Sequence, residues 1–169
     1  MHRDRYYSRI AVGFICLALI SVSTTAMVGW WQSRSAAVKP TYALGETLDV
    51  PPSLFAGAPQ TLLIFVRESC SVCRAEADGL AKIVATLNHL PSPLPTVVVT
   101  GSNDVEADRV FARSFGQIRH EHVAFSNLKL QVVPTVVLVD RQGSVLYTRE
   151  GRSKTADVIG ELMRRIPGR

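Results

Sequence analysis

Cysteine is scarce in this chain of 169 residues, which contains only three. Cys16 lies in an apolar run near the N-terminus, and Cys70 and Cys73 form a single Cys-x-x-Cys pair. A structural zinc site needs roughly four ligands, and no second Cys-x-x-Cys supplies them. The clustered donors His120 and His122 lie far along the chain. We therefore expect no metal site.

The chain also lacks a basic stripe with interleaved aromatic residues. Residues 1–39 hold five Lys or Arg and one Asp, a net charge of +4, whereas the other 130 residues hold fourteen basic and thirteen acidic side chains, a net charge of +1. A protein that binds nucleic acid usually concentrates its positive charge on one surface. Nucleic acid is therefore not an expected partner. Internal repeats and low-complexity segments are absent too.

The longest uncharged stretch is residues 10–31, which contain no Asp, Glu, Lys or Arg. At ~1.5 Å per residue, such a helix crosses a hydrocarbon core of ~30 Å. Arg3, Arg5 and Arg9 precede the stretch, and Trp30 and Trp31 end it. Basic residues stay in the cytoplasm and indole rings favour the membrane interface, so the pattern predicts a transmembrane helix with its N-terminus in the cytoplasm.

A cleaved signal peptide is the alternative interpretation of this stretch. Its apolar region is typically shorter, and only Thr24-Thr25-Ala26 resembles a cleavage site here. We therefore expect an uncleaved anchor. The predicted organisation is a cytoplasmic N-terminus over 1–9, an anchor over 10–31, a tether over 32–41 and one folded domain over 42–169.

The Cys70–Cys73 spacing suits reversible disulfide chemistry. Two thiols three positions apart at the start of a helix can form a disulfide with little backbone movement. The N–H groups and the positive dipole end of a helix N-terminus favour the thiolate form of the first cysteine. Cys70 is therefore the predicted nucleophile, and Cys73, one turn deeper, the predicted resolving thiol. With both cysteines of the predicted domain in one motif, the domain suits an oxidising compartment.

Hydrophobic patterning predicts alternating strands and helices. The apolar runs 61–66, 96–100 and 135–139 indicate buried strands, 144–150 an antiparallel neighbour, and 44–50 and 122–125 short strands. Helices are expected from a Ser69 cap through Leu87, over 101–115 and over 153–166. This order predicts an α/β domain with a central mixed β-sheet and helices on both faces.

Several motifs in this order resemble a known family. Phe65-Val66 precedes the cysteines, Arg74-Ala75-Glu76 follows them, and Val133-Pro134-Thr135 and Val139-Asp140-x-x-Gly143 come later. From about Leu44 to Arg165 the chain looks like a thioredoxin-fold domain, and specifically like the membrane-anchored TlpA/ResA-type redoxins of bacterial envelopes. It departs from that pattern at Ser69, where Trp is usual, at Ser71-Val72 and at Asp78-Gly79.

The resemblance implies roles for Val133 and Pro134, and helical spacing indicates one for Glu76. It implies a cis peptide between Val133 and Pro134, facing the thiols and presenting backbone to a bound substrate strand. Glu76 follows Cys73 by three positions, which places both on one face of a helix. Glu76 is therefore either a partly buried carboxylate that moves protons for Cys73 or a solvated helix residue.

Other polar residues near the motif carry weaker signals. Arg67 and Arg74 could favour the Cys70 thiolate but are interpreted as surface charges. His89, together with the two clustered histidines, is expected to be an ordinary surface residue.

These observations predict a thiol–disulfide oxidoreductase without a cofactor. The resemblance implies a single-pass protein of the bacterial inner membrane whose periplasmic domain reduces cysteine-containing envelope proteins, in cytochrome or metalloenzyme maturation, with electrons from a membrane or periplasmic donor. A peroxiredoxin would need Pro and Thr where the chain has Leu63 and Arg67. The alternative is a metallochaperone that binds Cu(I) through Cys70 and Cys73 as soft thiolates.

Overall fold

The central element of the fold is a five-stranded mixed sheet with strand order β3-β2-β1-β4-β5. Its strands are β1 (Gln60–Phe65), β2 (Thr96–Thr100), β3 (Arg119–His122), β4 (Thr135–Asp140) and β5 (Val145–Glu150). β1, β2 and β3 run parallel, β4 is antiparallel to β1, and β5 is antiparallel to β4. The predicted mixed sheet is therefore confirmed.

The computed structural model describes residues 41–55, 57–67, 69–101, 111, 113–116 and 118–166. All of them belong to one compact unit, Pro40–Arg169. The predicted anchor over 10–31 and most of the tether lie outside these residues, as does most of the helix expected over 101–115. Within the described part of the chain, no helix has the length and apolar character needed to span a membrane.

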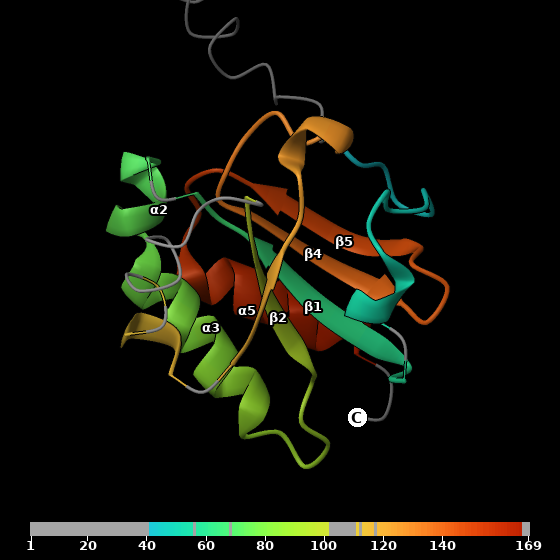
Figure 1. Ribbon diagram of the computed structural model, residues 1–169. Helices are drawn as coiled ribbons and strands as arrows, with labels where there is room; N and C mark the ends of the chain where they lie inside the picture. Colours follow the sequence, from blue (N-terminus) through green and yellow to red (C-terminus); the bar gives the residue numbers. More distant parts are fainter. Residues whose placement is uncertain are drawn as a thin grey trace, which may run out of the picture. The chain divides into compact units, whose positions relative to one another are not determined.

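Three α-helices are described: α2 (Ser71–Ala75), α3 (Ala77–Asn88) and α5 (Thr155–Arg165). In Figure 1, α3 and α5 lie side by side along the sheet, and residue contacts between them agree with this arrangement. Both pack on the same face, where Leu80, Leu87 and Leu162 join Leu62 and Ile64 of β1 in one core cluster. Alternate residues of β1 point to opposite faces, so the other half of the strand serves a second core.

The second face is covered differently from the prediction of helices on both sides. Leu63 and Phe65 of β1 pack there against Leu54 and Phe125. These two belong to single turns of 3-10 helix, η1 (Pro52–Leu54) and η2 (Phe125–Asn127), which lie far apart in the sequence. Among the described residues, long helices therefore cover one face only, and short turns with apolar side chains bury the other.

The predicted short strand over 44–50 is reduced to one bridge, between Thr47 and Ser144. This segment nevertheless follows the outer edge of β5: Val145 donates its N–H to the carbonyl oxygen of Glu46 at 2.9 Å, and Gly45 donates to that of Val145 at 2.8 Å. An uncovered strand edge is prone to pairing with other chains. The segment therefore protects β5.

The strand expected over 122–125 lies earlier, as β3 over Arg119–His122. Its sequence, Arg-His-Glu-His, lacks the apolar alternation of a half-buried strand. It forms because it pairs in parallel with β2 at the edge of the sheet. Charged residues are common in edge strands, so the tertiary position explains what the local pattern did not predict.

Candidate active site

The Cys-x-x-Cys pair lies directly after the end of β1. Val66, the residue after β1, donates its N–H to the carbonyl oxygen of Val99 at 3.0 Å, and a turn then brings the N–H of Cys70 to the carbonyl oxygen of Arg67 at 3.2 Å. Cys70 has extended backbone (φ −83°, ψ 103°) and is the N-cap of α2. The sequence predicts Ser69 as the N-cap, but the N-cap is Cys70.

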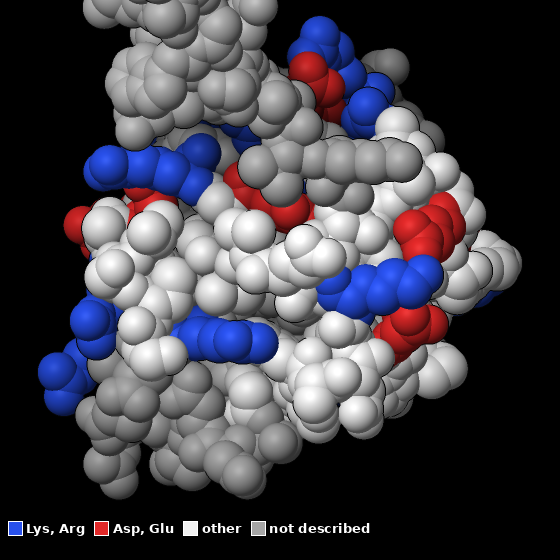
Figure 2. Space-filling model, turned by 90° about the horizontal axis from the view of Figure 1, so that it is seen from above, with Lys and Arg blue, Asp and Glu red and all other residues white. Residues whose placement is uncertain are grey.

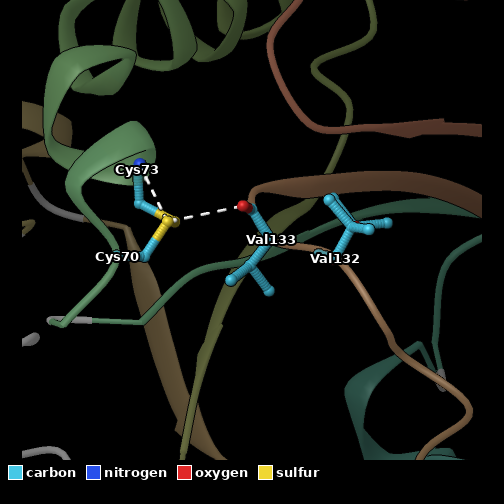
Figure 3. The surroundings of a disulfide bond; sticks show 5 residues. Cys70, Cys73, Val132 and Val133 are labelled. Atoms are coloured by element: carbon cyan, nitrogen blue, oxygen red, sulfur yellow. Dashed lines mark hydrogen bonds between the residues drawn. A yellow bond between two sulfur atoms is a disulfide. The ribbon is translucent and has the colours of Figure 1, made fainter. Parts of the chain in front are cut away.

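Cys70 and Cys73 are joined by a disulfide, with their Cα atoms 5.2 Å apart. The sulfur of Cys70 accepts a hydrogen bond from the backbone N–H of Cys73 at 3.0 Å (Figure 3). Cys73 is fully buried, whereas Cys70 is half-buried. In the reduced protein, the same N–H would stabilise negative charge on Cys70, because hydrogen bonds to an ionised group favour that form.

Val133 faces Cys70 from a loop that is distant in sequence. Its carbonyl oxygen lies 3.4 Å from the Cys70 sulfur, as Figure 3 shows. The peptide bond between Val133 and Pro134 is cis, as the resemblance implied. Pro134 accepts a hydrogen bond from the N–H of Gly151 at 2.7 Å. The thiols therefore lie close to the Val133–Pro134 loop and to the segment after β5. All three are at the same end of the sheet, where β1 and β5 end and β4 begins.

Glu76 occupies the junction at which the predicted single helix is broken into α2 and α3. Its side chain is 17% exposed and accepts a hydrogen bond at Oε1 from Nε of Arg152 at 2.8 Å. The carboxylate is therefore largely buried and ion-paired, not solvated. Sequence reasoning missed Arg152, because nothing in the local pattern connects the segment after β5 with a helix 76 positions earlier.

A small hollow, partly open to solvent, lies beside this ion pair. α3, β4, the end of β5 and the start of α5 form its walls. Its lining includes Glu76, Leu80, Pro134, Arg149, Gly151 and Thr155. Because Pro134 follows the residue that contacts the Cys70 sulfur, the hollow is next to the redox site.

The arginines near the motif and the histidines are mostly exposed. Arg67 is exposed, and its guanidinium carbon lies 4.9 Å from the centre of the Phe125 ring, a cation–π distance. Arg74 and His89 are exposed, as expected. His122 is exposed as well and its Nδ1 lies 3.0 Å from Oγ1 of Thr100. His120 corrects the prediction of a surface residue, because both of its ring nitrogens are buried.

The arrangement can perform thiol–disulfide exchange. Cys70 is half-buried, and its sulfur accepts a hydrogen bond from the N–H of Cys73. Cys73 is fully buried, and the carbonyl oxygen of Val133 lies beside the Cys70 sulfur. Among the described residues there is no group of three or more His, Cys, Asp or Glu that could hold a metal ion.

The fold of this chain is similar to those of several solved structures, although the sequence identities are low. No family model and no curated protein matches the sequence. Among solved structures, a thio-disulfide isomerase from Thermus thermophilus shares 19% identity with a TM-score of 0.53, covering 76% of this chain and 97% of that one. The thioredoxin domain of a thiol-disulfide oxidoreductase from Bacteroides vulgatus shares 15% identity with a TM-score of 0.55, covering 72% and 98%.

A secreted disulfide oxidoreductase from Mycobacterium tuberculosis, described as homologous to DsbE of E. coli, shares 18% identity with a TM-score of 0.53, covering 66% of this chain and 85% of that one. All three neighbours are thiol-disulfide oxidoreductases or isomerases by their descriptions. The chain therefore has the thioredoxin-like fold of these redoxins, with its own Cys70–Cys73 pair in place.

Proposed function

We propose that this protein is a thiol–disulfide oxidoreductase that exchanges disulfides with cysteines of partner proteins. The observation that carries the proposal is the difference between its two sulfurs: Cys70 is half-buried beside Val133, and Cys73 is fully buried behind it. A nucleophile must reach the partner, whereas a resolving thiol needs only to reach the nucleophile. The neighbouring folds support the same chemistry.

The reaction balances over two sulfur-exchange steps. The Cys70 thiolate attacks one sulfur of the partner disulfide, forms a mixed disulfide and releases the other partner sulfur as a thiolate. The Cys73 thiolate then attacks the Cys70 sulfur, forms the Cys70–Cys73 disulfide and releases the second partner thiolate. The protein loses two electrons and two thiol protons, and the partner gains two electrons and becomes a dithiol.

Glu76 is the proposed proton carrier for the second step. Cys73 is fully buried, so its proton needs an acceptor near the interior before it can attack. Glu76 lies one helical turn further on, and its largely buried carboxylate borders the hollow beside Pro134. A positioned carboxylate in such a place can act as a general base.

The cellular setting is part of the proposal and is supported by the sequence. The uncharged stretch over 10–31, preceded by three arginines, would anchor the protein in a bacterial inner membrane with the domain in the periplasm. There it would reduce cysteine-containing envelope proteins during cytochrome or metalloenzyme maturation, and a membrane or periplasmic donor would return electrons to it.

The direct test measures disulfide reduction and trapping by the full-length protein. We expect the reduced protein to reduce a protein disulfide such as insulin, the Cys70→Ser variant to be inactive, and the Cys73→Ser variant to accumulate a mixed disulfide through Cys70. Cys16→Ser, outside the motif, is the matched control and should behave as the parent protein.

Copper binding is the competing outcome of this test. If the reduced protein bound Cu(I) tightly through Cys70 and Cys73 but did not reduce disulfides, the oxidoreductase proposal would be replaced by a metallochaperone.

A further inference from the structure

The end of β5 and the segment that follows it bring two arginines to the redox site. Gly151 donates its N–H to the carbonyl oxygen of Pro134, and Val133 contacts the Cys70 sulfur. Arg149 lies two residues before Gly151, and Arg152 directly follows it. Their position relative to the thiols is therefore set by backbone contacts and not only by flexible side chains.

The two arginines differ in what they bind. Arg152 is 78% exposed, and its Nε donates to Glu76. Arg149 is also exposed; its Nε donates to Oγ of Ser153 at 2.8 Å, and none of the carboxylates in the described part of the chain pairs with it. A guanidinium has five N–H donors in a planar fork that fits a carboxylate. Both arginines therefore keep donors for a further anionic group.

The stretch of chain around Gly151 is mainly basic, and the carboxylate of Glu76, paired with Arg152, is the acidic group that faces it. Between 149 and 154 the chain has three basic side chains, Arg149, Arg152 and Lys154, and one acidic residue, Glu150. Glu150 accepts the N–H of Thr41 at Oε1 at 2.6 Å. Seen from above, both basic and acidic side chains lie around a largely uncharged central area (Figure 2). A partner segment that reaches the thiols would therefore meet positive charge on the β5 side.

We propose that Arg149 and Arg152 select partners that carry an acidic residue next to the reactive cysteine. This proposal rests on the oxidoreductase function. A chain docked with its cysteine sulfur at Cys70 places its neighbouring side chains within the reach of long side chains on adjacent loops. Arg149 lines the hollow beside Pro134, so an Asp or Glu held at the mouth of this hollow would lie near its guanidinium group.

The same contact would link recognition to chemistry. Arg152 is the ion-pair partner of Glu76, the carboxylate proposed to serve Cys73. A partner carboxylate that shares Arg152 would weaken its hold on Glu76 once the mixed disulfide has formed. An acidic partner would then both bind and free Glu76 for the resolving step.

The test uses the reduced full-length protein and three peptides that differ only at the residues flanking one cysteine. Each cysteine is capped as a mixed disulfide with 2-mercaptoethanol, and both flanking residues are Glu, Gln or Lys. We expect the second-order rate of reduction to be about two- to fivefold higher for the Glu peptide than for the Gln peptide, the range of an exposed ion pair. The Lys peptide should be slowest.

Two variants assign the preference to the arginines. Arg149→Gln has no contact with Glu76 and should lower the Glu-to-Gln rate ratio, and Arg149→Gln with Arg152→Gln should bring it to about one. Arg141→Gln is the matched control, because Arg141 lies in the turn after β4, at the opposite end of that strand from Pro134. It should keep the preference. Salt near 1 M should abolish the preference, since it shortens the Debye length to ~3 Å.

The outcomes separate this inference from the oxidoreductase proposal. Equal rates for all three peptides, or a preference that survives in the double variant, would overturn the acidic selectivity and leave the redox function intact. Failure to reduce any peptide would overturn the redox function itself.

Discussion

Arg152 donates a hydrogen bond from Nε to Oε1 of Glu76 at 2.8 Å and so joins the segment after β5 to the junction between α2 and α3. The two side chains differ in exposure, 78% for Arg152 and 17% for Glu76. A largely buried carboxylate held by an exposed guanidinium has a defined position at the edge of the hollow beside Pro134. A carboxylate in this position can be replaced by an amide of the same size, which tests the proposed role of Glu76 as proton carrier for Cys73.

Replacing Glu76 with Gln should slow disulfide exchange by about a hundredfold, the low end of what a positioned general acid or base contributes. It should also change the pH dependence of the exchange rate, because the proposed proton acceptor for Cys73 is lost. The measurement is the rate of reduction of a mixed disulfide between pH 5 and 10. Glu161→Gln, at a more exposed carboxylate on α5 that pairs with Arg164, is the control. Superimposable profiles for Glu76→Gln and the parent protein would show that Glu76 has no part in the reaction.

Cys70 should be alkylated before Cys73 in the reduced protein, because Cys70 is half-buried and Cys73 is fully buried. Limited iodoacetamide treatment followed by mass mapping of peptides measures the order. In urea-unfolded protein the difference should disappear, which attributes it to the fold. Preferential labelling of Cys73 in the native protein would exchange the proposed roles of the two thiols.

Gly143→Ala should destabilise the domain by about 2–4 kcal/mol, the sum of a left-handed backbone cost and overpacking. Gly143 has φ +81°, and an added Cβ would lie 2.7 Å from Cζ of Phe55. Gly116→Ala is the matched control, since Gly116 has φ +68° but nothing within 4 Å of an added Cβ. Chemical denaturation should show a loss of only about 1–2 kcal/mol for the control. Equal losses for the two variants would mean that the Phe55 contact costs nothing.

Tyr42→Phe should cost about 1 kcal/mol at pH 7, because the backbone N–H of Lys129 donates to the Tyr42 hydroxyl at 3.0 Å. The cost should shrink above pH 10. Burial raises the pKa of Tyr42, so the unfolded chain ionises first and this stabilisation is lost as pH rises through the folded-state pKa.

Urea unfolding at pH 7 and pH 10.5 measures both effects. Tyr147→Phe is the control: burial also raises the pKa of Tyr147, but in the described part of the structure its hydroxyl makes no hydrogen bond. It should cost less at pH 7. A Tyr42→Phe variant as stable as the parent protein at pH 7 would contradict the proposed contribution of this hydrogen bond.

An alkaline phosphatase fusion after Arg169 should be active, because the enzyme needs an oxidising compartment and the three arginines before residue 10 favour an N-terminus inside the cell. Replacing Arg3, Arg5 and Arg9 with Gln is a test of that signal and should lower the activity per molecule. A well-expressed but inactive fusion would contradict the periplasmic location.

The local sequence was sufficient for the buried strands β1, β2 and β4 and for the identity of the thiol pair. The buried runs in β1, β2 and β4 are continuous and apolar, so their periodicity and length indicate strands without knowledge of their neighbours. The spacing of Cys70 and Cys73 allows a local disulfide, and the structure contains it.

Tertiary structure alone decided which distant residues meet at that pair. Arg152 reaches Glu76 because β5 ends beside the Val133–Pro134 loop, an arrangement set by strand register and not by any local pattern. The polar strand β3 likewise exists because β2 offers it a partner. Local propensity determines where an apolar strand can form, whereas long-range pairing determines which charged side chains are brought to the thiols.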